Sequence, residues 1–116
     1  LYYNLLEGLP VSCNSIDTQN FSSFHLFPIV LNCKNKSLHR KNLFDFLRKN
    51  LINVNVHYIP IYRHPFYRGK KLPFSNFPNT ESFYTGAISL PIHTKLTEIN
   101  VIRITNLIKK YIKKHF

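Results

Sequence analysis

The sequence contains no methionine, no tryptophan, two cysteines and only five acidic residues among 116. No apolar run reaches the roughly 18 residues that a membrane-spanning helix needs, and the N-terminal residues lack the order of a signal peptide. Cys13 and Cys33 form no CxxC motif, so they indicate small buried thiols rather than a disulfide framework or a zinc knuckle. These absences favour a cytoplasmic protein without membrane contact.

Composition favours one folded domain. Hydrophobic residues make up 44% and aromatic residues 15% of the chain, which is more than a disordered segment carries. A chain of 116 residues has room for one hydrophobic core, but not for two ordinary domains. Because a complete translation product begins with methionine, we expect residues 1–116 to be a single domain of a longer protein.

Charge leaves two interpretations open. Sixteen Lys and Arg against five Asp and Glu give a formal charge of +11, which is compatible with a phosphate-bearing partner, either a nucleotide or a polymer. The sequence is also rich in Asn, Ile, Lys, Phe and Tyr, a bias that AT-rich coding produces without selection for nucleic-acid binding. A solvated basic surface therefore explains the charge as well as an anionic partner does.

Hydrophobic spacing predicts strands and helices in alternation. Residues 24–31 form an apolar run of strand length, in which Pro28 favours an edge position or a bulge. Helical spacing follows over residues 38–50, with Ser37 as the N-cap. Apolar and polar residues then alternate over residues 52–58, which predicts a half-buried strand.

Turn and cap residues delimit the remaining elements. Gly8 ends an N-terminal helix, Pro78 opens a short helix that Gly86 closes, and residues 87–91 form a further strand. Thr97 caps the last helix. This order implies an α/β fold, a small mixed sheet of about three strands covered by helices.

Several short motifs follow one another along the chain. They are "SFHLFPI", "HYIP", "HPFY", "FPNTE", "SLP" and "LT" before a closing helix. In this order they resemble the C-terminal part of the DegT/DnrJ/EryC1/StrS sugar aminotransferases, enzymes of fold type I that depend on pyridoxal phosphate (PLP). The spacing is most similar to enzymes that aminate C4 of a UDP-linked 4-keto-6-deoxy-N-acetylhexosamine, on routes to surface or flagellar glycans such as pseudaminic acid.

The resemblance also implies what this chain lacks. In the family, the lysine that joins PLP and the aspartate beneath its ring lie in a large N-terminal domain, and no lysine here sits in a similar motif. A lysine of that kind is essential to the chemistry. We therefore expect no catalytic residue, no bound PLP and no transaminase activity in the isolated chain. The nucleotide sugar and the amino donor would meet it through the missing large domain, in a parent homodimer.

The end of the predicted middle strand and the loop that follows should form one wall of the substrate cleft, as the resemblance implies. Neutral hydrogen-bonding side chains there suit a sugar hydroxyl or a donor carboxylate, and an arginine suits a carboxylate or phosphate. The candidate substrate-binding residues are His57, Tyr58, Tyr62, Arg63 and His25. Each could instead be an ordinary packed or solvated side chain. We expect Glu81 to support the start of its helix rather than a ligand.

The sequence also bears on two other kinds of site. The spacing of His57 and His64 matches no common metal-ligand pattern, so we expect no metal. The alternative function is a small basic nucleic-acid-binding module, without an RNP, KH or zinc-finger signature, in which aromatic side chains stack on bases among cations. Its residues would be Tyr58, Tyr62, Phe66 and Tyr67, with Arg63, Arg68, Lys70 and Lys71.

Overall fold

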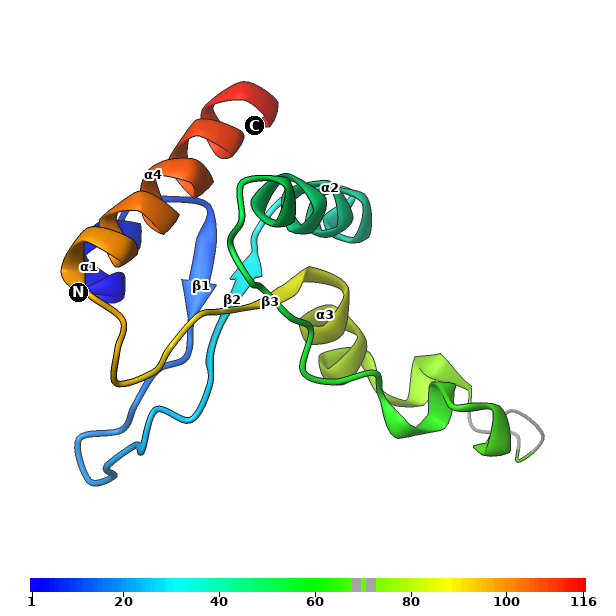
Figure 1. Cartoon of the computed structure of the whole chain (residues 1–116). Helices are drawn as coiled ribbons and strands as arrows, with labels where there is room; N and C mark the ends of the chain where they lie inside the picture. The colour runs from blue at the N-terminus through cyan, green and yellow to red at the C-terminus, as the bar shows by residue number, and fades with distance from the viewer. Residues whose placement is uncertain (68–69, 71–72) are drawn as a thin grey trace.

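A three-stranded sheet lies at the centre of the computed structural model, which describes residues 1–67, 70 and 73–116 (Figure 1). Its strands are β1 (Val11–Cys13), β2 (Phe27–Leu31) and β3 (Ala87–Leu90), in the order β1-β2-β3. The α/β class and the number of strands are confirmed. Both pairings between the described strands are antiparallel, so the sheet is not mixed as expected.

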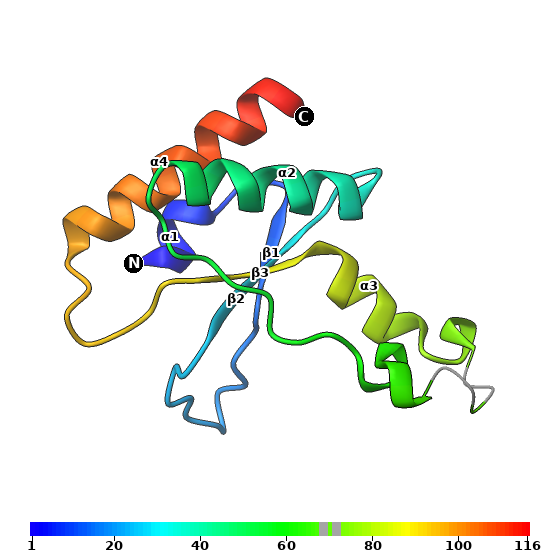
Figure 2. The same cartoon turned by 45° about the vertical axis from the view of Figure 1, so that its right-hand side comes forward.

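Four helices accompany the sheet: α1 (Tyr2–Leu6), α2 (Lys36–Lys49), α3 (Pro78–Gly86) and α4 (Glu98–His115). Helices α2 and α4 lie side by side above the sheet, whereas α3 points away from it (Figures 1 and 2). The core forms where the sheet meets α1, α2 and α4. Its residues include Leu6, Phe27, Ile29, Leu31, Leu43, Leu47, Ile88, Val101, Ile104 and Ile108.

Local signals place the ends of α3 and α4 correctly. Pro78 opens α3 as predicted, and its missing N–H would have no helical partner there. The Thr97 hydroxyl caps α4, accepting a hydrogen bond from Asn100 N at 3.3 Å. Helix α2 instead begins at Lys36, one residue before the predicted cap Ser37. Asn35 precedes it in the left-handed conformation (φ 54°), which asparagine tolerates better than most residues.

Pro28 lies in the central strand of the three, not in an edge strand as predicted. Its Cα partner is Ser89 of β3, and the N–H and C=O of Ser89 bond to Asn55 on the other side. The nitrogen of Pro28 therefore faces the β1 side, beyond Cys13, where β1 has ended. The proline thus costs the ladder no hydrogen bond.

The strand predicted over residues 52–58 is wrong, although its alternating burial is confirmed for Ile52 and Val54. One isolated bridge, Asn55 to Ser89, joins this segment to β3. The next hydrogen-bonding positions on that edge of β3 would be Pro91 and Ala87. Pro91 has no N–H, and the N–H of Ala87 bonds to Phe83 O at the end of α3. Neither position therefore offers an N–H to continue the ladder.

Two segments project from the core: the loop of residues 14–26, and the described residues of the range 57–77, which we name the arm (Figures 1 and 2). The radius of gyration is 15.4 Å, against about 13 Å for a compact domain of this length. The described part of the arm contains short 3-10 turns at Ile61–Arg63, Pro65–Tyr67 and Phe74–Asn76.

Within the described part of the chain, no helix is long and apolar enough to span a membrane, and no three metal-ligating side chains come together. Cys13 and Cys33 are free and half-buried rather than fully buried, and burial raises the pKa of both thiols. Neither thiol is activated.

Candidate functional site

The carboxylate of Glu81 holds the start of the arm. Tyr62 Oη donates to Glu81 Oε1 at 2.7 Å, and Arg63 Nε donates to the same oxygen at 3.0 Å. Arg63 Nη2 pairs with Glu81 Oε2, which completes a two-point contact. Two of the predicted substrate-binding side chains are therefore fixed by one acidic residue of α3.

Aromatic rings enclose this network. The ring of Tyr62 stacks on that of Phe77, with centroids 4.4 Å apart and planes at 10°. The guanidinium carbon of Arg63 lies 4.3 Å from the centroid of the Phe74 ring and 5.2 Å from that of Tyr84. Such cation–π contacts add to the ion pair and fix the plane of the guanidinium. The arm is thus anchored to α3 by polar and aromatic contacts.

Glu81 and Arg63 stabilise each other's charged forms. The hydrogen bond from Arg63 holds the pKa of Glu81 below its ordinary value, against the opposing effect of burial. The same hydrogen bond raises the pKa of Arg63. Burial, and then the hydrogen bond to Glu81, raise the pKa of Tyr62. At neutral pH the network therefore consists of an ion pair and a neutral phenol.

Glu81 has a role that local reasoning missed. Sequence analysis assigned its carboxylate to the start of α3, and it does lie in the first turn. Its side chain, however, bonds to Tyr62 and Arg63. The "FPNTE" motif marks the residue, but the partners lie 18 and 19 positions earlier and have no fixed relation to it in sequence.

His57 and Tyr58 form the part of the arm that remains available. Their ring centroids are 4.7 Å apart in an edge-to-face arrangement. The side chain of Tyr58 is 71% exposed. His57 is half-buried, and its Nδ1 atom is buried without a hydrogen-bond partner among the described residues. A buried ring nitrogen is costly to leave unpaired, so it is a candidate contact for a ligand group.

His25 lies apart from these residues. It is exposed on the loop of residues 14–26, which projects separately from the arm (Figure 2). The structure forms two pairs among the five candidates: His57 and Tyr58 are joined by a ring contact, and Tyr62 and Arg63 are joined through Glu81.

Large apolar side chains are exposed on both projections. Tyr58, Ile59, Ile61, Phe66 and Phe74 of the arm are 49–72% exposed, and Phe21 of the loop is 96% exposed. Exposed apolar groups concentrated in this way mark surfaces that contact other polypeptide or ligands.

Two of the aromatic rings that the nucleic-acid interpretation uses already have partners within the chain. Lys70 Nζ lies 4.5 Å from the centroid of the Phe66 ring and so covers one of its faces. Tyr62 is buried against Phe77. Arg68 and Lys71, which the nucleic-acid interpretation also uses, lie outside the described residues.

The family model described as the DegT/DnrJ/EryC1/StrS aminotransferase family matches residues 1–109. The chain belongs to this family. Its members among known proteins include the dTDP-4-amino-4,6-dideoxy-D-glucose transaminase of Escherichia coli, 32% identical over 93% of the chain. The UDP-4-amino-4,6-dideoxy-N-acetyl-beta-L-altrosamine transaminase of Helicobacter pylori is 35% identical over 77% of the chain. The resemblance inferred from the motifs is confirmed.

Solved structures of the family share the fold. PseC of Helicobacter pylori, an aminotransferase involved in the biosynthesis of pseudoaminic acid, superposes on 97% of the chain with a TM-score of 0.84 and 28% identity. Spr1654 of Streptococcus pneumoniae, in its PLP form, superposes on 97% of the chain with a TM-score of 0.88 and 27% sequence identity. The chain is thus a domain of an aminotransferase family with sugar aminotransferase homologues, and family members bind PLP.

The chain spans only part of these relatives. It covers 30% of the E. coli enzyme and 23% of the H. pylori enzyme, and 30% and 29% of the PseC and Spr1654 chains. Within the described residues of this chain, every lysine is exposed or half-buried. A lysine that joins PLP must be held as a neutral amine beside the cofactor. The described residues therefore do not provide a site that joins PLP.

Proposed function

We propose that this chain is the C-terminal small domain of a PLP-dependent aminotransferase acting on a nucleotide-linked keto sugar, and that its arm forms one wall of the substrate cleft. The observation that carries the proposal is the arm itself. Glu81 and the surrounding rings attach Tyr62 and Arg63 to α3, while His57 and Tyr58 keep polar groups without partners in the described structure. Attachment of this kind supports a role in substrate positioning.

Each candidate residue has a distinct role in this proposal. Tyr58 offers an exposed hydroxyl and His57 an unpaired ring nitrogen, both suited to a sugar hydroxyl or a donor carboxylate. Arg63 uses Nε and Nη2 for Glu81, which leaves Nη1 for a carboxylate or phosphate oxygen. Tyr62 would support the wall through its hydrogen bond to Glu81. His25 would contribute from the separate loop.

The remainder of the active site would come from polypeptide that relatives carry in addition to this segment. That part would hold PLP and supply the lysine, so the isolated chain would be inactive. The exposed apolar side chains of the arm and loop support this arrangement, because they suit burial against a large domain or a second subunit of a homodimer. A cytoplasmic location follows from the use of nucleotide sugars as substrates.

The identity of the sugar can be narrowed further. One relative is named as a dTDP-4-amino-4,6-dideoxy-D-glucose transaminase, and another as a UDP-4-amino-4,6-dideoxy-N-acetyl-beta-L-altrosamine transaminase. Both names place the amino group at C4 of a 6-deoxy sugar. We propose a nucleotide-linked 4-keto-6-deoxyhexose as the substrate, in the biosynthesis of a surface or flagellar glycan such as one that contains pseudaminic acid.

The proposal is tested on the product of the complete native gene, by mass spectrometry and absorbance. We expect a chain of three to four times this length with a pyridoxal band that bleaches when glutamate is added. Glutamate should then allow amination of a UDP- or dTDP-linked 4-keto-6-deoxyhexose. A product without the band, or one that binds single-stranded RNA with steep salt dependence, would contradict the proposal and favour the nucleic-acid alternative.

A further inference from the structure

One side of α4 carries four exposed cations and no acidic side chain. We name these residues the basic stripe: Arg103, Lys110, Lys113 and Lys114. Lys110 lies seven residues after Arg103, and the other two lysines lie three and four residues after Lys110. These spacings place all four on one side of the helix. Residues 99–116 contain no Asp or Glu, so no opposite charge interrupts the stripe.

The charges of the stripe are not compensated within the fold. None of the four cations pairs with a carboxylate in the described part of the chain. Like charges three or four residues apart repel one another on a helix surface, and Lys110 has Lys113 and Lys114 at these spacings. An anionic partner would relieve this repulsion.

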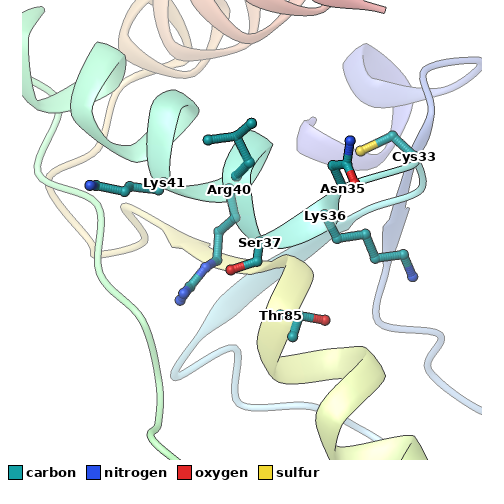
Figure 3. A pocket seen from close by; sticks show the side chains of 8 residues that line it. Cys33, Asn35, Lys36, Ser37, Arg40, Lys41 and Thr85 are labelled. Atoms are coloured by element: carbon teal, nitrogen blue, oxygen red, sulfur yellow. The ribbon is translucent and has the colours of Figure 1, made fainter.

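The shape of the stripe indicates an extended partner. Residues 103–114 of a helix span about 17 Å at 1.5 Å per residue, which is longer than a single small anion. The cations at the start of α2 form no comparable surface. Lys36, Arg40 and Lys41 line an open hollow there, and Figure 3 shows their side chains pointing in different directions.

Large apolar side chains are exposed at the N-terminal end of the stripe. Ile99 and Ile102 are 77% and 43% exposed. Leu51 is 86% exposed, and it lies close to Arg103, because Arg103 Nη2 donates to Asn50 O at 2.8 Å. Leu51 and Arg103 also line the same surface hollow of about 210 Å³. Aliphatic and basic side chains therefore meet on this part of the surface.

The backbone of Leu51 is an independent observation. Leu51 has a φ of 62° and follows the end of α2, where the N–H of Ile52 bonds to Leu47 O. Glycine usually occupies this left-handed position after a helix. A leucine here keeps a strained backbone and an apolar side chain in solvent. Strain that the fold does not require is a feature of functional surfaces.

We propose that the basic stripe, with Leu51, Ile99 and Ile102, forms a peripheral contact with the surface of an anionic phospholipid membrane. The cations attract the headgroup phosphates, and the aliphatic side chains enter the interface. Nucleic acid fits less well, because these seven residues include no aromatic ring on which a base could stack.

This contact is compatible with the other features of the chain. The expected lack of membrane contact was based on the absence of a spanning segment, which a peripheral surface does not need. The surface uses no residue of the arm, so the inference does not depend on the proposed function. The arm and α4 lie at opposite ends of the molecule (Figures 1 and 2).

The test is sedimentation of the chain with two kinds of vesicle. One kind is phosphatidylcholine alone, and the other contains one part phosphatidylglycerol to two parts phosphatidylcholine. We expect partitioning at least about tenfold stronger onto the anionic vesicles, and weaker when salt is added. Equal partitioning onto both kinds would overturn the proposal.

A measurement on the wild-type chain locates the contact. Anionic vesicles that carry a gadolinium-chelating lipid should broaden the amide NMR signals of Leu51 and of residues 99–114 more than those of the arm. Equal broadening in α4 and the arm would show attraction by net charge alone and would overturn the proposal. This result decides the matter if circular dichroism shows that a variant does not fold.

Variants separate the stripe from general charge. Lys110→Gln should weaken partitioning about fivefold, whereas Lys70→Gln, which removes the same charge from the arm, should weaken it less than about twofold. Leu51→Asn keeps the charge and suits the left-handed backbone better. It should not lower the melting temperature, but it should weaken partitioning at least about threefold. Equal losses in the two lysine variants would overturn the proposal, and wild-type partitioning of Leu51→Asn would overturn it in favour of a partner bound by charge alone, such as nucleic acid.

Discussion

The hydroxyl of Tyr62 donates a hydrogen bond of 2.7 Å to Glu81, nineteen positions later in the chain. Through this bond, and through the adjacent ion pair with Arg63, a projecting segment with three short turns is tied to helix α3. The orientation of His57 and Tyr58 relative to the sheet depends on that attachment, because Asn55 is the last residue before them that bonds to the sheet.

Replacing Glu81 with glutamine should loosen the arm. The amide can still accept a bond from Tyr62, but it leaves Arg63 without a counter-charge. We expect faster proteolysis within residues 57–77 and a melting temperature lowered by about 2–6 °C. Asp45→Asn is the matched control, since Asp45 is exposed on α2 and makes no ion pair with the residues described. Equal proteolysis of the two variants would show that the network does not hold the arm.

The attachment should also depend on pH. Arg63 lowers the pKa of Glu81 in the folded chain, so the carboxylate stabilises the fold above the ordinary glutamate pKa. This contribution is lost as the pH falls through the lower, folded pKa. Proteolysis of the arm should therefore accelerate below about pH 4.3, and this extra acid sensitivity should be absent from Glu81→Gln. An identical pH profile in both proteins would contradict the assignment.

Helix α4 should contribute strongly to stability through its buried stripe. Ile108 is fully buried in the hydrophobic core, and truncation leaves a cavity. We expect Ile108→Ala to lower the free energy of unfolding in urea by about 2–5 kcal/mol. Ile99 lies on the same helix but is 77% exposed, so Ile99→Ala should change it by less than about 0.5 kcal/mol. Similar losses of unfolding free energy in both variants would contradict the orientation of α4 described above.

Gly86 should not tolerate a side chain. A Cβ atom there would lie 3.0 Å from Val30 Cγ1 and 3.1 Å from Leu31 O. Gly86→Ala should therefore destabilise the fold by about 1–3 kcal/mol, although alanine favours helices. Thr80→Ala, at an exposed position of the same helix, is the control. A more stable Gly86→Ala variant would contradict the close packing of α3 on β2.

Sequence reasoning succeeded where a single residue fixes local geometry. Pro78 and Thr97 act within one helical turn, so the starts of α3 and α4 were predictable. Gly86 was correctly predicted to end α3, but it does so for a reason other than that of a helix stop signal. It has no unusual conformation and is required because the helix approaches the backbone of β2. That approach is a tertiary property that helix stop signals do not encode.

The incorrect predictions likewise concern features that depend on residues far apart in the sequence. The alternation predicts burial correctly over residues 52–55, yet a ladder also needs free N–H groups on β3, and these are missing at Pro91 and Ala87. Strand β1 was not predicted, because three residues carry no periodic signal and it forms only against β2. In the candidate site, the residue types were foreseen, whereas the bonds from Tyr62 and Arg63 to Glu81 were not.

The central claim is that the arm forms a wall of the sugar cleft, and steady-state kinetics of Tyr58→Phe and His57→Ala in the complete native enzyme tests it most directly. His93→Ala is the control, because His93 is exposed in the segment after β3, away from the arm (Figure 1). The account predicts a KM for the nucleotide sugar raised about tenfold in both arm variants, with the pyridoxal absorbance unchanged. An unaltered KM in both would contradict it.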